Sequence, residues 1–160
     1  MKKLLLIFAL ITTPCTADTV FKYGSNAAKE GESLGSTKSI FIANQNQWFG
    51  PFSDQYEVGV WFDNTGIKGR KSSGLLGYSL GVNVNSGYLF GQAFIGPSLI
   101  SHTDSNLGGH FQFNNDIAFG LRDPESQSTI GINYKHVSSA GLELPNKGRD
   151  FLMFRVGISW

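Results

Sequence analysis

Cysteine is almost absent from this sequence, with a single residue, Cys15, among 160. The chain therefore cannot form an internal disulfide, even at an oxidising destination. Charge is also scarce, because charged residues make up 16% of the chain, against about 25% in ordinary soluble domains. The formal net charge is +1. This balance leaves no basic footprint of the kind that binds nucleic acid, and we expect no nucleic-acid partner.

Long apolar runs are missing as well. Near the N-terminus, the run Leu4–Ile11 follows two lysines and is too short to cross a bilayer as a helix. Small residues come next and end at Ala17. The pattern predicts a signal peptide at residues 1–17 and a mature domain at residues 18–160. Cys15 also suggests a lipoprotein site, but the residues before it lack the usual aliphatic side chain.

Helix periodicity is not found after the predicted signal peptide, and alternation of apolar and polar residues recurs instead. Turn signals separate about eight alternating segments, the arrangement of an up-and-down all-β fold. The expected strands are at about 19–28, 36–45, 55–63, 76–84, 88–101, 111–122, 129–138 and 150–160. The faces of the fifth segment are ambiguous, because both are apolar.

In most of these segments one face is rich in Phe, Leu, Ile and Val, while the other carries Gly, Ser, Asn and charge. The charged residues on the second face are Glu57, Asp63, Asp116, Arg122, Lys135 and Arg155. A secreted soluble β fold would bury the apolar face. The width of that face, the export signal and the terminal Trp160 favour the inside-out alternative. We therefore predict an all-β, eight-stranded antiparallel up-and-down transmembrane β-barrel in the bacterial outer membrane.

A histidine, a hydroxyl and a carboxylate end apolar rows close to one loop. Counting by twos places His136 and Ser138 on the face of Ile130, and Asp150 on the face of Leu152. The three groups match the nucleophile, base and orienting acid of a hydrolase triad. If that face meets lipid, the natural substrate is a lipid lying beside the barrel. The alternative is that these residues simply reach the lipid headgroups at the rim.

The stretch His136–Leu142, followed by Pro145–Asp150, resembles the C-terminal signature of the PagL-type lipid A 3-O-deacylases. These are also known as acyloxyacyl-hydrolase-like outer-membrane proteins. The upstream stretches 107–113 and 117–121 resemble the penultimate-hairpin region of the same family. The resemblance covers roughly residues 96–160, while the earlier strands match only in pattern.

The resemblance implies hydrolysis of the ester-linked acyl chain at position 3 of lipid A, by a Ser/His/acid triad on the lipid-facing barrel surface. By motif position, Ser138 would be the nucleophile, His136 the general base and Asp150 the orienting acid. The side chain of Asn146 and the backbone amide of Gly141 would stabilise the oxyanion. Lipid A, the membrane anchor of lipopolysaccharide, would be the substrate, and neither a metal nor another cofactor is expected.

Two positions depart from the family pattern. The family usually has Glu where Asp150 stands, so this carboxylate is one methylene shorter and must lie nearer to the histidine. It usually has Asn where Ser139 stands, directly after the expected nucleophile. The acyl-chain preference, a homodimeric state and regulation in the membrane stay open.

Other interpretations belong to different classes. One is a non-enzymatic small outer-membrane barrel for adhesion or structural support. Another is a lipid acyltransferase, which is disfavoured because that barrel begins with an amphipathic helix and residues 18–28 have a strand pattern. His102, Asp104 and His110 match no standard metal-ligand spacing, so a solvated loop is expected there. The basic loop 68–71 could contact lipid phosphates or be solvated.

Overall fold

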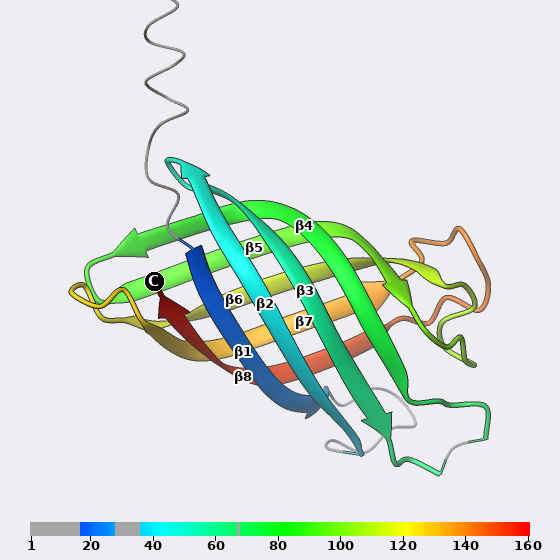
Figure 1. Cartoon of the computed structure of the whole chain (residues 1–160). Helices are drawn as coiled ribbons and strands as arrows, with labels where there is room; N and C mark the ends of the chain where they lie inside the picture. The colour runs from blue at the N-terminus through cyan, green and yellow to red at the C-terminus, as the bar shows by residue number, and fades with distance from the viewer. Residues whose placement is uncertain (1–16, 28–35, 67) are drawn as a thin grey trace, which may run out of the picture.

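A computed structural model describes residues 17–27, 36–66 and 68–160. It is a closed antiparallel barrel in which each of eight strands pairs with the next and the last pairs with the first, as predicted (Figure 1). The strands are β1 (Ala17–Asn26), β2 (Thr37–Phe49), β3 (Phe52–Asp63), β4 (Ser73–Ser86), β5 (Leu89–Ile100), β6 (Phe111–Arg122), β7 (Thr129–Ser138) and β8 (Arg149–Ser159). Apart from Ala17, which begins β1, the predicted signal peptide lies outside the described residues. No helix among the described residues is long and apolar enough to cross a membrane.

The observed strands follow the predicted ones, with the main differences at strand ends. β2 and β3 continue to a tight turn at Gly50 and Pro51, where Phe49 pairs with Phe52. Backbone pairing extends the ladder past the point where side-chain alternation is visible. In β5, the even-numbered residues such as Phe94 point inward. Pairing with both neighbours thus resolves a face that the sequence left ambiguous.

Side chains on the outside of the barrel are mostly apolar. Large residues such as Leu76, Ile95 and Phe119 are 62%, 62% and 64% exposed. The charged residues Glu57 and Lys135 are instead buried inside. An apolar exterior around a polar interior is the pattern of a transmembrane barrel and the reverse of a soluble β fold. Closure also pairs every strand edge, which lipid requires.

A network of four charges fills the middle of the barrel. Lys22 Nζ lies 2.6 Å from Glu57 Oε2 and 3.2 Å from Asp116 Oδ1. Lys135 Nζ lies 2.6 Å from Glu57 Oε1 and also contacts Asp116. Asn133 donates a further hydrogen bond of 2.7 Å to Asp116. Cations and carboxylates therefore neutralise one another inside the barrel, which offsets part of the cost of burying them.

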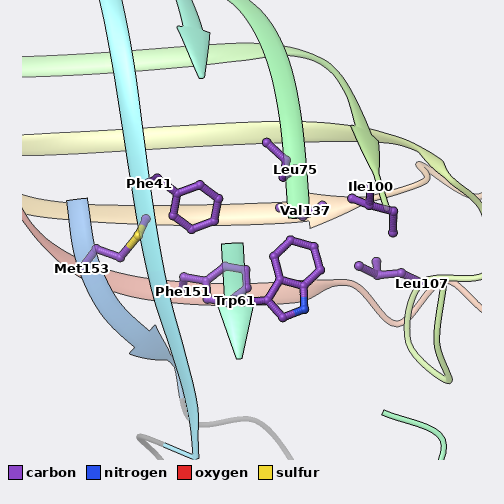
Figure 2. Packing of buried hydrophobic residues seen from close by; sticks show 8 residues of the cluster. All are labelled: Phe41, Trp61, Leu75, Ile100, Leu107, Val137, Phe151 and Met153. Carbon is purple, nitrogen blue, oxygen red and sulfur yellow. The ribbon is translucent and has the colours of Figure 1, made fainter. Parts of the chain in front are cut away.

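Beside this network, an apolar cluster occupies the loop end of the interior (Figure 2). Its members are Phe41, Trp61, Leu75, Ile100, Leu107, Val137, Phe151 and Met153. The Phe151 ring contacts the Phe41 and Trp61 rings, with centroids 5.9 and 5.7 Å away. Through Val137 and Phe151, the cluster lies directly inside the end of β7 and the start of β8.

The two ends of the barrel differ. The chain termini lie at the end that carries the short turns, including the two-residue turn between β2 and β3 (Figure 1). The connection from β7 to β8 lies at the opposite end (Figure 1). In outer-membrane barrels the short turns face the periplasm and the longer loops face the exterior. The β7–β8 loop is therefore extracellular.

Candidate active site

His136 and Asp150 form a hydrogen-bonded pair on the outer surface of the barrel. They lie directly opposite each other on β7 and β8. His136 Nδ1 lies 2.6 Å from Asp150 Oδ1. A carboxylate is an acceptor only, so Nδ1 donates, and in the neutral tautomer with that proton Nε2 is the acceptor. The side chains of His136 and Asp150 are 31% and 16% exposed, so the pair is shielded but reachable.

Tyr134 joins this pair from the same strand. It lies two residues before His136, and its hydroxyl donates to Asp150 Oδ1 over 2.6 Å. Alternation in the sequence puts Tyr134 in the same outward row as Ile130 and His136, but it gives no sign of this contact. In an antiparallel strand pair, an aromatic side chain can reach the residue diagonally opposite on the neighbouring strand. The sequence feature that could have predicted the contact is therefore a tyrosine placed diagonally to a carboxylate.

Ser138 is the next outward residue after His136. It lies opposite Phe113 of β6 and is partly exposed at the end of β7. Among the contacts of the described residues, no hydrogen bond joins Ser138 to His136. Such bonds are frequently long in unliganded hydrolases and tighten when the substrate binds. The strand thus places the hydroxyl and the imidazole on one face without pairing them.

The strands are packed firmly behind these polar groups. Val137 lies between His136 and Ser138 in sequence and points inward, and Phe151 does the same next to Asp150. Both are fully buried in the apolar cluster of Figure 2. Packing of this kind fixes the backbone that carries the outward side chains.

The β7–β8 loop is organised by side chains that bond to its own backbone. Asn146 Oδ1 accepts a hydrogen bond of 2.9 Å from the Ser139 amide. The hydroxyl of the buried Ser139 donates to the Glu143 carbonyl over 2.9 Å. Asn146 is held by its oxygen, so its Nδ2 group can donate elsewhere. Gly141 is exposed and has a φ of 84°, which turns the chain sharply after Ser139.

Gly148 brings the loop backbone against the imidazole. Its φ is 71°, and a Cβ at this position would lie 2.7 Å from His136 Cε1 and 3.3 Å from Nε2. A side chain therefore fits neither the conformation nor the space. The carbonyl of Gly148 accepts a hydrogen bond of 3.5 Å from Asn106.

The neighbouring β5–β6 loop supports the β7–β8 loop. The Gly108 amide donates to the Pro145 carbonyl over 2.7 Å, and the Lys147 amide donates to Asn106 over 2.9 Å. These two bonds make up the isolated β-bridge between Leu107 and Asn146. Together with the bond from Asn106 to the Gly148 carbonyl, three hydrogen bonds tie the loop beside His136 to the β5–β6 loop.

Arg149 adds a charged clamp at the same end. Its guanidinium lies 3.2 Å from Asp63 Oδ2 at the end of β3 and also contacts Asp104 of the β5–β6 loop. All three side chains are nearly inaccessible to solvent. The arginine therefore links the start of β8 to two other elements.

The remaining histidines take local partners. His110 Nδ1 lies 2.8 Å from the Ile100 carbonyl, and His102 Nδ1 lies 3.0 Å from Ser101 Oγ. Asp104 accepts the Asn106 amide within its own loop at 2.8 Å. Across the described ranges, no group of three or more His, Cys, Asp or Glu residues is arranged to hold a metal ion.

Together, the inside-out barrel and the polar group on its outer face define a small outer-membrane β-barrel with a surface site. A family model described as "Lipid A 3-O-deacylase (PagL)" matches residues 33–159, and the chain belongs to this family. A curated relative, the lipid A deacylase PagL of Bordetella bronchiseptica (strain ATCC BAA-588 / NCTC 13252 / RB50), is 38% identical over 65 residues. That match covers 38% of this chain and 35% of the relative.

Solved structures share the fold. The crystal structure of the outer-membrane enzyme PagL has a TM-score of 0.69 at 20% identity and covers 88% of this chain and 98% of its own. Neisserial surface protein A has a TM-score of 0.58 at 9% identity, covering 91% and 96%. Yersinia pestis Ail, the attachment invasion locus protein, has 0.56 at 7%, covering 91% and 98%. The TM-scores show a common barrel fold, and at these low identities the likeness shows the fold alone.

Proposed function

We propose that this protein hydrolyses the ester-linked acyl chain at position 3 of lipid A, with Ser138, His136 and Asp150 as its catalytic triad. The observation that carries the proposal is the His136–Asp150 hydrogen bond of 2.6 Å on the lipid-facing surface, one outward position from Ser138. Membership of the lipid A 3-O-deacylase family supports the same activity.

The position of the site suits a membrane lipid as substrate. The outward face of the barrel meets acyl chains, and the extracellular end of β7 and β8 lies at the level of the outer leaflet. Lipid A belongs to that leaflet. A substrate molecule can therefore approach sideways within the membrane, with its ester near the headgroup boundary.

The chemistry follows from the arrangement of donors and acceptors. His136 Nε2 accepts the proton of Ser138 as Oγ attacks the ester carbonyl carbon. Asp150 holds the Nδ1–H and stabilises the imidazolium that forms. Collapse of the tetrahedral intermediate breaks the bond to the sugar oxygen, which takes the proton from His136. Water, deprotonated by the same imidazole, then releases the fatty acid from Ser138.

The oxyanion of the intermediate needs donors that are in place before the reaction. Asn146 Nδ2 suits this role, because Oδ1 of the same side chain is anchored on the Ser139 amide at 2.9 Å. The second donor is the amide of the exposed Gly141, in the turn that follows Ser139. Both groups lie in the loop that begins directly after the nucleophile.

Mass spectrometry of lipid A from cells that produce the protein tests the proposal. We expect the wild type to remove one ester-linked acyl chain and Ser138→Ala to leave lipid A intact. Ser86→Ala, at the opposite end of the barrel, is the matched control and should behave as wild type. Unchanged lipid A in cells with correctly folded wild-type protein would refute the proposal. It would favour a non-enzymatic barrel, whose fold is shared with Neisserial surface protein A and with the attachment invasion locus protein Ail.

A further inference from the structure

Asp150 uses one oxygen to accept two hydrogen bonds. Oδ1 lies 2.6 Å from His136 Nδ1 and 2.6 Å from the Tyr134 hydroxyl. Both donors come from β7, two residues apart and on the same outward face. In the strand register, His136 is directly opposite Asp150, while Tyr134 is opposite Leu152 and reaches back along the diagonal.

We propose that Tyr134 is a positioning residue of the hydrolase, whose hydroxyl holds the Asp150 carboxylate in the orientation that directs His136. This inference rests on the activity proposed above. It assigns Tyr134 no contact with the reacting atoms. Tyr134 acts through Asp150 alone.

The physical reason lies in where the carboxylate sits. The Asp150 side chain is 16% exposed on a surface that faces lipid, so little water reaches it. A buried anion needs hydrogen-bond donors to replace its lost solvation. The Tyr134 hydroxyl supplies one donor and bonds to the oxygen that also accepts from His136. It therefore fixes that oxygen rather than drawing the carboxylate away.

Tyrosines on barrel surfaces also serve as ordinary anchors at the membrane interface. The chain offers a comparison of that kind in Tyr78 of β4. Its hydroxyl donates to Asp54 over 3.4 Å, far along the sheet from β7. Tyr78→Phe removes a similar hydroxyl without touching Asp150. It is therefore the matched control for Tyr134→Phe.

A double-mutant cycle on purified protein with lipid A in detergent tests the proposal. The variants are Tyr134→Phe, Asp150→Asn and the double substitution, with Ser138→Ala as blank. Tyr134→Phe should lower kcat by about 10- to 100-fold, the size expected for a hydrogen bond to a charged group. KM should stay unchanged. With Asp150→Asn already present, Tyr134→Phe should cause little further loss, because coupled residues are not additive.

Labelling of Ser138 by a fluorophosphonate gives a second measure. Its rate should fall in Tyr134→Phe in parallel with kcat, while unboiled gels show a folded barrel. Tyr78→Phe should match the wild type in all assays.

Three results would overturn the positioning role. They are full activity in Tyr134→Phe, a rise in KM alone, and an equal loss with and without Asp150→Asn. Wild-type protein that releases no acyl chain would overturn the proposed function itself, and the positioning role with it. An active wild type beside an inactive Ser138→Ala keeps these failures distinguishable.

Discussion

The Asn146 side chain carries both a hydrogen-bond acceptor, Oδ1, and a donor, Nδ2. A substitution can remove the donor while it keeps the acceptor. Asn146→Asp keeps the oxygen that accepts from the Ser139 amide but replaces the Nδ2 donor with an anionic oxygen. Loss of one oxyanion donor typically costs about 10²- to 10³-fold in kcat. We expect a loss of that order in lipid A turnover, with the loop still folded. Asn146→Ala also loses the Ser139 contact and should be cut faster by protease in the β7–β8 loop. Wild-type turnover in Asn146→Asp would exclude the oxyanion role.

Gly148 shapes the site through its backbone. Gly148→Ala places a Cβ at 2.7 Å from His136 Cε1 and strains a φ of 71°. The imidazole must then move, so we expect deacylation to fall at least tenfold while the barrel stays folded. The control is Gly66→Ala, which has a similar φ of 68° but no atom within 4 Å of the added Cβ. Equal activity in the two variants would show that the imidazole tolerates displacement.

Arg149 connects separate elements of the structure, because its guanidinium, at the start of β8, contacts both Asp63 and Asp104. Arg149→Gln leaves these two carboxylates without their cation. Removing one partner of a buried ion pair costs about 3–5 kcal/mol. We expect the loops to loosen before the barrel does, so protease should cleave them faster and turnover should drop. Arg122→Gln at the periplasmic end is the control. Unchanged proteolysis would mean that the backbone bonds between the loops suffice.

Lys135 affects the stability of the whole barrel, because its ammonium group binds carboxylates from different strands. Lys135→Met leaves Glu57 and Asp116 sharing Lys22 as their cation within the network. We expect a loss of stability of about 3–5 kcal/mol, seen as a lower urea midpoint for the compact gel band. Lys38→Met, on the exposed surface of β2, should leave the midpoint unchanged. An unaltered urea midpoint in Lys135→Met would show that other groups in the barrel interior are enough to stabilise the two carboxylates.

The sequence by itself determined the architecture of the barrel and the faces of its strands. Apolar side chains repeat every two residues, so the outward set was readable in most strands but not in β5, where both faces are apolar. Closure follows because lipid tolerates no unpaired strand edge. The same count placed His136, Ser138 and Asp150 on one face. It could not supply strand ends such as Phe49, where pairing continues without alternation.

The tertiary structure alone decided the contacts around the site. Strand register set His136 opposite Asp150 and brought Tyr134 within reach of the same oxygen. Loop packing brought Gly148 against the imidazole and Arg149 against Asp63. These contacts join residues from different strands and loops, and their geometry depends on backbone hydrogen bonds and positive φ angles. A local pattern of side chains encodes the face of each residue, but it does not encode the partner across the strand.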